Sequence, residues 1–171
     1  MDYMASVELA LKNEQTEMEF YRNEASRSKN QLAKAMFNQL AKDEEEHMNR
    51  IRELHEKLTA EGKWPADVAI QVAGTDIRKV LDQTVSKAGS SEDHDDDDLK
   101  ALQKAAAFEA KGAKFYADLA ATCENPMEKT FFEFLAKIER EHRLSINDSI
   151  AYLEDPEAWM MAAGGAGLDG A

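Results

Sequence analysis

Two short motifs place a glutamate and a histidine at a spacing that suits a metal ion. Glu44 and His47 form the first Glu-x-x-His pair, and Glu139 and His142 form the second. On a helix, residues three apart lie on the same face, so each pair can direct a carboxylate and an imidazole to one region. One such pair in a charged helix is ordinarily a solvated face. Two pairs accompanied by further ligands favour a metal site.

An internal repeat supplies the further ligands. The differences 109 − 14, 139 − 44 and 142 − 47 all equal 95, and the alignment needs no gap. The repeat pairs Glu14 with Glu109, and it also pairs aromatic and turn residues: Phe20 with Phe115, Tyr21 with Tyr116, Asn30 with Asn125, and Phe37 with Phe132. Four carboxylates and two imidazoles are costly to bury uncompensated, but two divalent cations would neutralise the four glutamates formally. The repeat therefore predicts a site for two metal ions.

Helices are the elements that must position these residues. Apolar residues recur three, four or seven positions apart over about residues 4–28 and again over about 32–60, which is the spacing of one helix face. We expect two more helices over about 99–122 and 126–154, the last capped by Asn125. The short connection within each pair makes its helices antiparallel neighbours. The chain thus contains two hairpins, at about residues 4–60 and 99–154.

A long connection over residues 61–98 joins the hairpins. Gly62 and Pro65 end the second helix, and residues 76–86 are expected to form a short helix with Thr75 as its cap. A connection of 38 residues can span well over the roughly 40 Å length of a helix of about 28 residues, so the third helix can begin at the far end of the bundle.

The predicted fold is all-α: a four-helix bundle of two pseudo-symmetric antiparallel hairpins joined by a long crossover that contains a short helix. Residues 1–155 form this bundle. Residues 156–171 are expected to be a flexible tail, because the end of the chain is rich in Gly and Ala and has no periodicity.

Composition excludes several classes of function. The net charge of −13 disfavours nucleic acid as a partner, because such binders neutralise phosphates with Lys and Arg. No stretch approaches the roughly 18 consecutive apolar residues of a membrane-spanning helix. A single cysteine, Cys123, cannot form an internal disulfide or an iron–sulfur centre. With no signal-peptide pattern, we expect a cytoplasmic protein.

The repeated segments resemble the rubrerythrin family of ferritin-like proteins. The resemblance is carried by ALKNEQTEMEFYRNEA and FNQLAKDEEEH and by their second copies, AAAFEAKGAKFYADLA and FEFLAKIEREH. Their ligand set, a Glu from each of two helices and a Glu-x-x-His from each of the others, is that of ferritin-like di-iron carboxylate proteins. The resemblance thus implies two iron ions per chain, although affinity order would also admit zinc or manganese.

The resemblance also implies a role for each ligand. Glu44 and Glu139 would bridge the metals, and Glu14 and Glu109 would be terminal ligands, with His47 and His142 completing the ends. Tyr21 and Tyr116 would lie next to the metal pocket, where a tyrosine that merely packs in the core with a satisfied hydroxyl is the alternative.

Two departures from the family pattern change what is expected. Rubrerythrins carry a further carboxylate three residues after the Glu of the third helix, where this chain has Gly112. The matching position of the first helix is Glu17, which we expect to take that role from the opposite side, with a surface glutamate as the alternative. The rubredoxin-like domain with its two CxxC pairs is also missing, so we expect a separate electron-donor protein.

The expected activity is a peroxidase: a diferrous centre reduces hydrogen peroxide to water, and a donor such as a rubredoxin-like protein then reduces the diferric product. Ferroxidase activity with iron storage or detoxification, using oxygen or peroxide, is the alternative. A metal-free interaction module would not explain why six ionisable groups repeat in register. We expect a homodimer, as in family members with this bundle.

Overall fold

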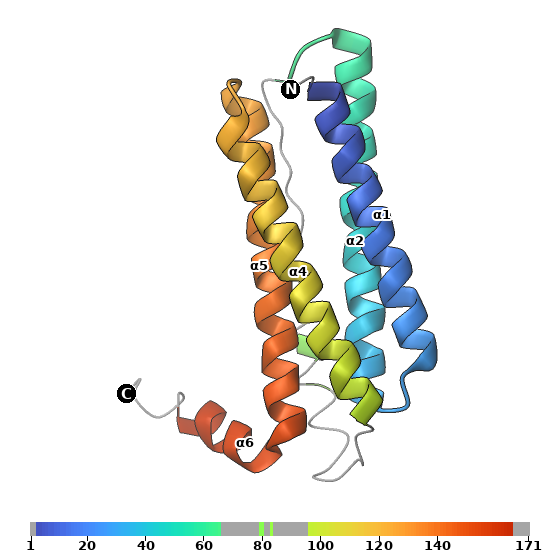
Figure 1. The fold of residues 1–171 in the computed structure, drawn as a ribbon, viewed down its shortest axis with the longest axis vertical. Coiled ribbons are helices and arrows are strands. Elements are labelled where there is room, and N and C mark those ends of the chain that lie inside the picture. Colours follow the sequence, from blue (N-terminus) through green and yellow to red (C-terminus); the bar gives the residue numbers. More distant parts are fainter. Residues whose placement is uncertain (1–2, 66–78, 81–82, 84–95, 166–171) are drawn as a thin grey trace.

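Four long helices pack as a bundle (Figure 1). The computed structural model describes residues 3–65, 79–80, 83 and 96–165. The first hairpin consists of α1 (Tyr3–Arg27) and α2 (Gln31–Glu61), and the second consists of α4 (Asp96–Thr122) and α5 (Pro126–Glu154). No strand occurs within these described ranges. The predicted all-α, ferritin-like bundle is confirmed.

The turns of both hairpins are fixed by the same cap. The side-chain oxygen of Asn30 accepts the backbone N–H groups of Leu32 and Ala33, at 2.9 and 3.1 Å. Asn125 does the same for Met127 and Glu128 at the start of α5. These bonds satisfy donors that a helix cannot satisfy internally. The offset of 95 residues therefore applies to the turns as well as to the helices.

The long connection brings α4 back to the end of the bundle where α1 turns into α2. One carboxylate oxygen of Asp98 accepts the backbone N–H groups of Lys29 and Asn30, at 3.2 and 2.8 Å. At the opposite end, α2 stops at Gly62, which has a φ of 66° and donates its N–H to Leu58 at 2.9 Å. Such a left-handed residue ends a helix at little cost when it is glycine. The third long helix therefore starts at the end predicted from the length of the connection.

Most of the predicted short helix over residues 76–86 lies outside the described residues. Within it, Lys79, Val80 and Gln83 are helical. None of the helices in the described part of the chain has the length and apolarity that crossing a bilayer requires.

The prediction of a flexible tail from residue 156 is wrong for its first ten residues, which form helix α6 (Pro156–Gly165). Asp155 and Pro156 end α5, but they also start a new helix, because an Asp at the cap and a Pro in the first turn favour initiation. The Asp155 carboxylate accepts the N–H of Ala158 at 2.9 Å. Trp159 then holds α6 on α5 by donating to Asp148 at 2.8 Å. Residues 166–171 lie outside the described residues.

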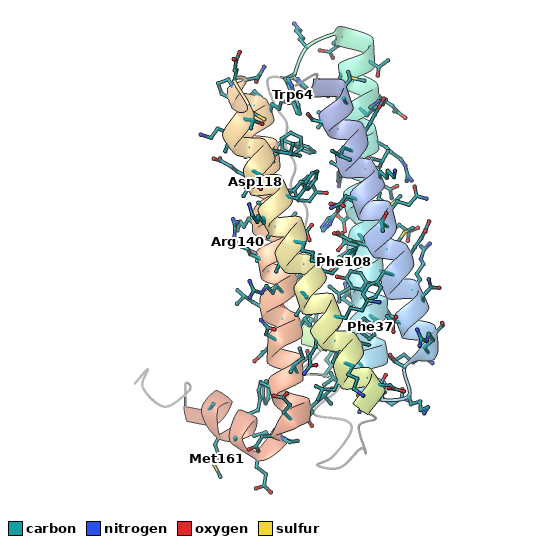
Figure 2. All side chains as sticks on the ribbon, viewed as in Figure 1. Phe37, Trp64, Phe108, Asp118, Arg140 and Met161 are labelled. Atoms are coloured by element: carbon teal, nitrogen blue, oxygen red, sulfur yellow. The ribbon has the colours of Figure 1, made fainter. Side chains whose placement is uncertain are left out.

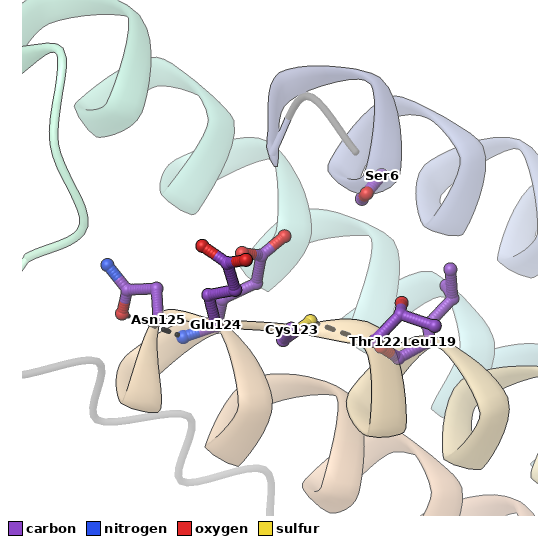
Figure 3. Close-up of a pocket in the computed structure, with 7 residues that line it drawn as sticks. Ser6, Leu119, Thr122, Cys123, Glu124 and Asn125 are labelled. Atoms are coloured by element: carbon purple, nitrogen blue, oxygen red, sulfur yellow. Dashed lines mark hydrogen bonds between the residues drawn. The ribbon is translucent and has the colours of Figure 1, made fainter.

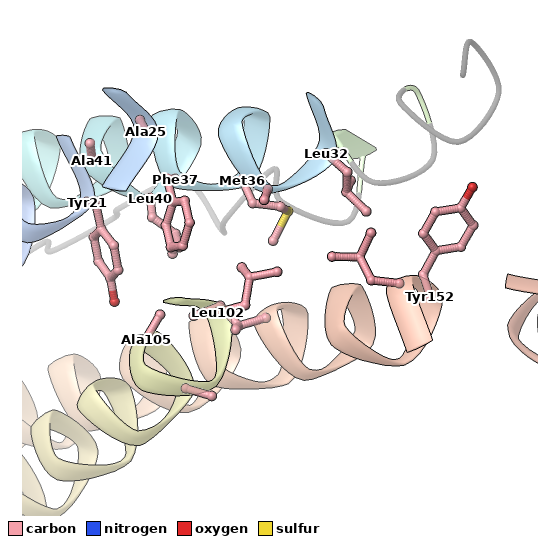
Figure 4. Packing of buried hydrophobic residues seen from close by; sticks show 14 residues of the cluster. Tyr21, Ala25, Leu32, Met36, Phe37, Leu40, Ala41, Leu102, Ala105 and Tyr152 are labelled. Atoms are coloured by element: carbon pink, nitrogen blue, oxygen red, sulfur yellow. The ribbon is translucent and has the colours of Figure 1, made fainter. Parts of the chain in front are cut away.

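Two apolar clusters fill the bundle, one on each side of a polar layer. The first contains Tyr21, Phe37, Leu102 and Tyr152, together with Met36 and Leu40 (Figure 4). The second contains Tyr116, Phe131, Phe132, Ile51 and Leu135. Each cluster draws residues from all four long helices. Burial of this apolar surface is the main force that holds the hairpins together, and it positions the polar layer between them.

Candidate metal centre

The six predicted ligands and Glu17 all lie in the polar layer between the apolar clusters. None of these seven side chains is more than 2% exposed. They come from all four helices: Glu14 and Glu17 from α1, Glu44 and His47 from α2, Glu109 from α4, and Glu139 and His142 from α5. Three groups among them have potential ligand atoms within 4.8 Å of one another, and each group includes Glu44. The structure thus brings every predicted ligand together.

Glu44 lies between the two histidines. Its Oε2 is 2.9 Å from Nδ1 of His47, and its Oε1 is 3.1 Å from Nδ1 of His142. The two imidazole rings stack with their centroids 5.5 Å apart. Each carboxylate oxygen of Glu44 thus faces a different histidine, which is the arrangement that a ligand between two ions requires. Coordination by Glu44 stays a prediction.

The terminal glutamates complete each half of the layer. Glu14 Oε2 lies 3.1 Å from Nδ1 of His47, and Glu109 Oε1 lies 3.5 Å from Nδ1 of His142. One half therefore joins Glu14 with His47, and the other joins Glu109 with His142. The repeat of the two hairpins therefore places two similar groups of candidate metal ligands side by side.

Tyrosines from each hairpin reach the terminal glutamate of the other. Tyr21 on α1 donates its hydroxyl hydrogen to Glu109, and Tyr116 on α4 donates to Glu14. Burial raises the pKa of both phenols well above its usual value, and the neighbouring carboxylates raise it further. Both phenols therefore stay protonated and can act as donors. Their hydrogen bonds fix the orientation of the two terminal carboxylates.

Glu17 points into the layer rather than into solvent. It groups with Glu14, Glu44 and Glu139, and the amide of Asn13 donates to its Oε1 at 3.4 Å. Opposite it, a Cβ added to Gly112 would lie 3.2 Å from Glu17 Oε1 and 3.0 Å from Glu139 Oε2. The absence of a side chain at residue 112 therefore makes room for these two carboxylates.

The layer carries more carboxylate than its protein partners can compensate. Burial first, and then the charge of neighbouring carboxylates, raises the pKa of Glu14 to about 7 and the pKa of Glu17 and Glu139 well above the usual value. Burial lowers the pKa of His47, but Glu44 and Glu14 outweigh it and raise that pKa to about 10. Burial also raises the pKa of Glu44, but the two histidines reverse this and hold it well below its ordinary value.

Several buried atoms of the layer have no hydrogen-bond partner among the described residues. They are both carboxylate oxygens of Glu139, Oε1 of Glu44, Oε2 of Glu17 and of Glu109, and both ring nitrogens of His142. Unsatisfied buried polar atoms cost free energy unless a bound ion or solvent uses them. Five carboxylates and two imidazoles form a donor set suited to first-row transition metals. The residues present therefore fit a pair of metal ions.

The side chain of Asp43 also neighbours the layer, although it belongs to neither repeated motif. Its Oδ2 lies 3.7 Å from Nε2 of His142. The signal in the sequence is weak, because an acidic residue beside Glu44 is unremarkable in a segment as charged as KDEEEH.

The pocket at one end of the bundle is separate from this layer (Figure 3). It has a volume of about 250 Å³ and is lined by Ser6, Leu119, Thr122, Cys123, Glu124, Asn125 and Glu128. The thiol of Cys123 donates to the carbonyl of Leu119. Burial raises the pKa of this thiol to about 11, helped by Glu128. Cys123 is thus a neutral thiol, unsuited to act as a nucleophile.

A family model matches part of the chain. The family model for rubrerythrin matches residues 6–86, which include nearly all of the first hairpin. No curated protein and no solved structure matches the chain. The second hairpin carries the same ligand types at the same offset, and the two hairpins close around one layer. The first hairpin is therefore similar to the rubrerythrin family of ferritin-like proteins.

Proposed function

We propose that this protein is a di-iron oxidoreductase that reduces hydrogen peroxide to water, with electrons from a separate donor such as a rubredoxin-like protein. The observation that supports it most is the meeting of two imidazole and carboxylate sets at Glu44, inside a layer from which bulk water is excluded. The donor types alone would also suit zinc or manganese. The match of residues 6–86 to the rubrerythrin family model favours iron.

The residues of the layer divide into distinct roles in this proposal. When bound, two ferrous ions supply the two electrons that, together with two protons, convert one peroxide molecule into two waters. Glu44 and Glu139 would lie between the ions. Glu14 with His47 would hold one ion and Glu109 with His142 the other. Tyr21 and Tyr116 keep the terminal carboxylates in place through their hydrogen bonds.

Glu17 is proposed as a seventh ligand. Its burial, its grouping with three other carboxylates and the room left for it at Gly112 support this role. Rubrerythrins place the corresponding carboxylate on the third helix, as the resemblance implies, so this chain would hold a mirrored site.

The test combines metal content with oxidation kinetics. The purified protein is analysed for iron, reduced without oxygen, and mixed rapidly with stoichiometric hydrogen peroxide or with oxygen, while the absorbance of the oxidised site is followed. We expect two irons per chain and faster oxidation by peroxide. Glu44→Gln should abolish both, whereas Glu45→Gln, at the exposed neighbouring position, should change neither.

Other outcomes would redirect the proposal. Faster oxidation by oxygen, with iron accumulating beyond two per chain, would indicate ferroxidase activity and storage. A wild-type protein that binds no metal would overturn the site itself. The homodimer is part of the same proposal, and the mass of the particle in solution tests it.

A further inference from the structure

The outer ring nitrogen of His142, which is turned away from the glutamates of the layer, faces a carboxylate of α2. Nδ1 of His142 faces Glu44 and Glu109, at 3.1 and 3.5 Å, so its Nε2 points away from the proposed ions. There it meets the carboxylate of Asp43 on α2, with Nε2 and Oδ2 3.7 Å apart. This carboxylate is itself held, because Gln39 donates to its other oxygen at 2.7 Å. A chain of contacts thus runs from Gln39 through Asp43 to His142.

The internal repeat lacks this chain in its second copy. At the offset of 95 residues, Gln39 corresponds to Phe134 and Asp43 to Ile138. Neither residue has a side-chain atom that can accept a hydrogen bond, and Ile138 is buried in the second apolar cluster. The two α5 residues at the corresponding positions therefore cannot give His47 the carboxylate contact that Asp43 gives to His142.

We infer that Asp43 is a positioning residue for His142 and strengthens metal binding at the Glu109–His142 position alone. The inference rests on the metal site of the proposed function. A histidine ligand whose other ring N–H is donated to a carboxylate is fixed in tautomer and orientation and is a stronger ligand. If Nε2 of His142 donates its hydrogen to Asp43, the lone pair of Nδ1 is left to bind a metal ion. The separation of 3.7 Å would have to shorten by about 1 Å to form this hydrogen bond.

The two proposed metal positions would then differ in affinity, although each has one terminal glutamate and one histidine. Loss of the outer partner of a ligating histidine typically weakens metal binding about 10- to 100-fold. Asp43→Asn keeps the size of the side chain but lacks the charge, so it should weaken one of two metal equivalents by this factor. The other equivalent should keep its affinity.

The test is an anaerobic titration of the full-length, metal-free protein with cobalt(II), which reports binding through its visible absorption. We expect two equivalents in the wild type and selective weakening of one in Asp43→Asn. The decisive comparison uses two backgrounds. In His47→Ala, where the His142 position remains, Asp43→Asn should still weaken binding about 10- to 100-fold. In His142→Ala, it should change the remaining affinity less than about twofold.

Two further variants guard against misfolding and non-specific charge effects. Gln39→Met removes only the amide that holds Asp43, and it should weaken the same equivalent to a smaller degree. Asp118→Asn removes an exposed carboxylate that pairs with Lys114, and it should leave both equivalents unchanged. Circular dichroism and the melting temperature of each metal-free variant show whether the fold is intact.

The outcomes separate this inference from the proposed function. Equal weakening of both equivalents, no weakening in Asp43→Asn and Gln39→Met, or an effect that persists in His142→Ala would overturn the role of Asp43 and leave the metal site standing. A wild-type protein that binds no cobalt or iron would overturn both.

Discussion

The absence of a side chain at residue 112 shapes the polar layer. A methyl group there would lie 3.0 Å from Glu139 Oε2 and 3.2 Å from Glu17 Oε1, closer than ordinary contact, so at least one carboxylate would have to move. We predict that Gly112→Ala lowers the bound metal from two equivalents towards one, while the metal-free fold changes by no more than about 1 kcal/mol, because Ala favours a helix interior over Gly. Metal analysis and urea unfolding measure the two effects. Lys111→Ala, at the exposed neighbouring position, is the control, and unaltered metal content in Gly112→Ala would contradict the prediction.

Glu17 can be tested without changing the shape of the site. Glu17→Gln keeps the volume of the side chain but cannot carry a negative charge, so a ligand role predicts less bound metal and slower oxidation by peroxide. The adjacent and partly exposed Asn13 donates to Glu17 and can also donate to a glutamine oxygen, which keeps the fold intact. Elemental analysis and stopped-flow absorbance provide the measurements. If neither quantity changes, Glu17 is a buried acid without a ligand role.

The raised pKa of the buried glutamates predicts how the stability of the metal-free protein depends on pH. The pKa of Glu14 is raised from 4.5 to about 7 by burial and then by Glu44, so the folded state holds a proton that the unfolded chain has released. The stability that this proton contributes is fully present below pH 4.5 and is lost as pH rises towards 7. The pKa of His47 is also raised, from 6.5 to about 10. Stability therefore continues to fall as pH rises between these two values.

We therefore predict that the metal-free protein is less stable at pH 8 than at pH 5, by an amount on the order of 1.4 kcal/mol for each unit of pKa shift involved. Urea unfolding in the presence of a chelator measures it. Glu14→Gln should reduce the dependence. A stability that rises between pH 5 and pH 8 would show that the glutamates are already ionised in the folded state.

At the scale of the helices, periodicity and caps were sufficient to predict the bundle. The spacing of apolar residues located four long helices, and the Asn30 and Asn125 caps sit where the repeat placed them. Helix α6 was missed because a Pro after an Asp can end one helix and start the next. What holds α6 is a contact between residues eleven apart, the bond from Trp159 to Asp148, which no local pattern reveals. On α6 itself, Met161 is exposed (Figure 2).

The residues of the polar layer also fall into two groups, those that the internal repeat predicts and those that it does not. The six inner residues could be predicted because the repeat duplicated them. The contact of Asp43 with His142 could not, since it crosses between hairpins and has no second copy. The pairing of each tyrosine with the glutamate of the other hairpin also depends on how the hairpins pack, so the sequence placed Tyr21 and Tyr116 near the site without naming their partners.

The two helix caps differ in burial, which predicts that replacing them by alanine lowers the free energy of unfolding by unequal amounts. Asn30 is 4% exposed and caps donors that are also buried, whereas Asn125 is exposed. Water can replace Asn125 but has little access to the start of α2, so we expect Asn30→Ala to cost about 2 kcal/mol and Asn125→Ala about 0.5 kcal/mol, the two ends of the range for such caps. Urea unfolding of both variants under identical conditions provides the comparison. Equal losses would mean that burial does not decide the cost.

For the whole molecule, a polar layer separates two apolar clusters, and both hairpins contribute to all three. Most contacts between helices lie within a hairpin, so the association of the hairpins depends on the clusters and on groups that cross the layer. Tyr21 and Tyr116 are two such links. Bound ions would add another, because each half-site would take ligands from both hairpins through Glu44 and Glu139. Metal binding and bundle stability should therefore be coupled.

This coupling predicts a large thermal effect of metal. A ligand at 100 times its dissociation constant stabilises the folded state by about 2.7 kcal/mol per site, and each kcal/mol raises the melting temperature of a domain of this size by about 2–4 °C. Two ions should therefore raise it by at least about 10 °C, as anaerobic calorimetry with and without ferrous ions would measure. Glu44→Gln should lose most of this rise, because Glu44 faces both histidines, and Glu45→Gln should keep it. A rise of the same size in Glu44→Gln would place the stabilising ions outside the layer, and no rise in the wild type would mean that the hairpins associate without them.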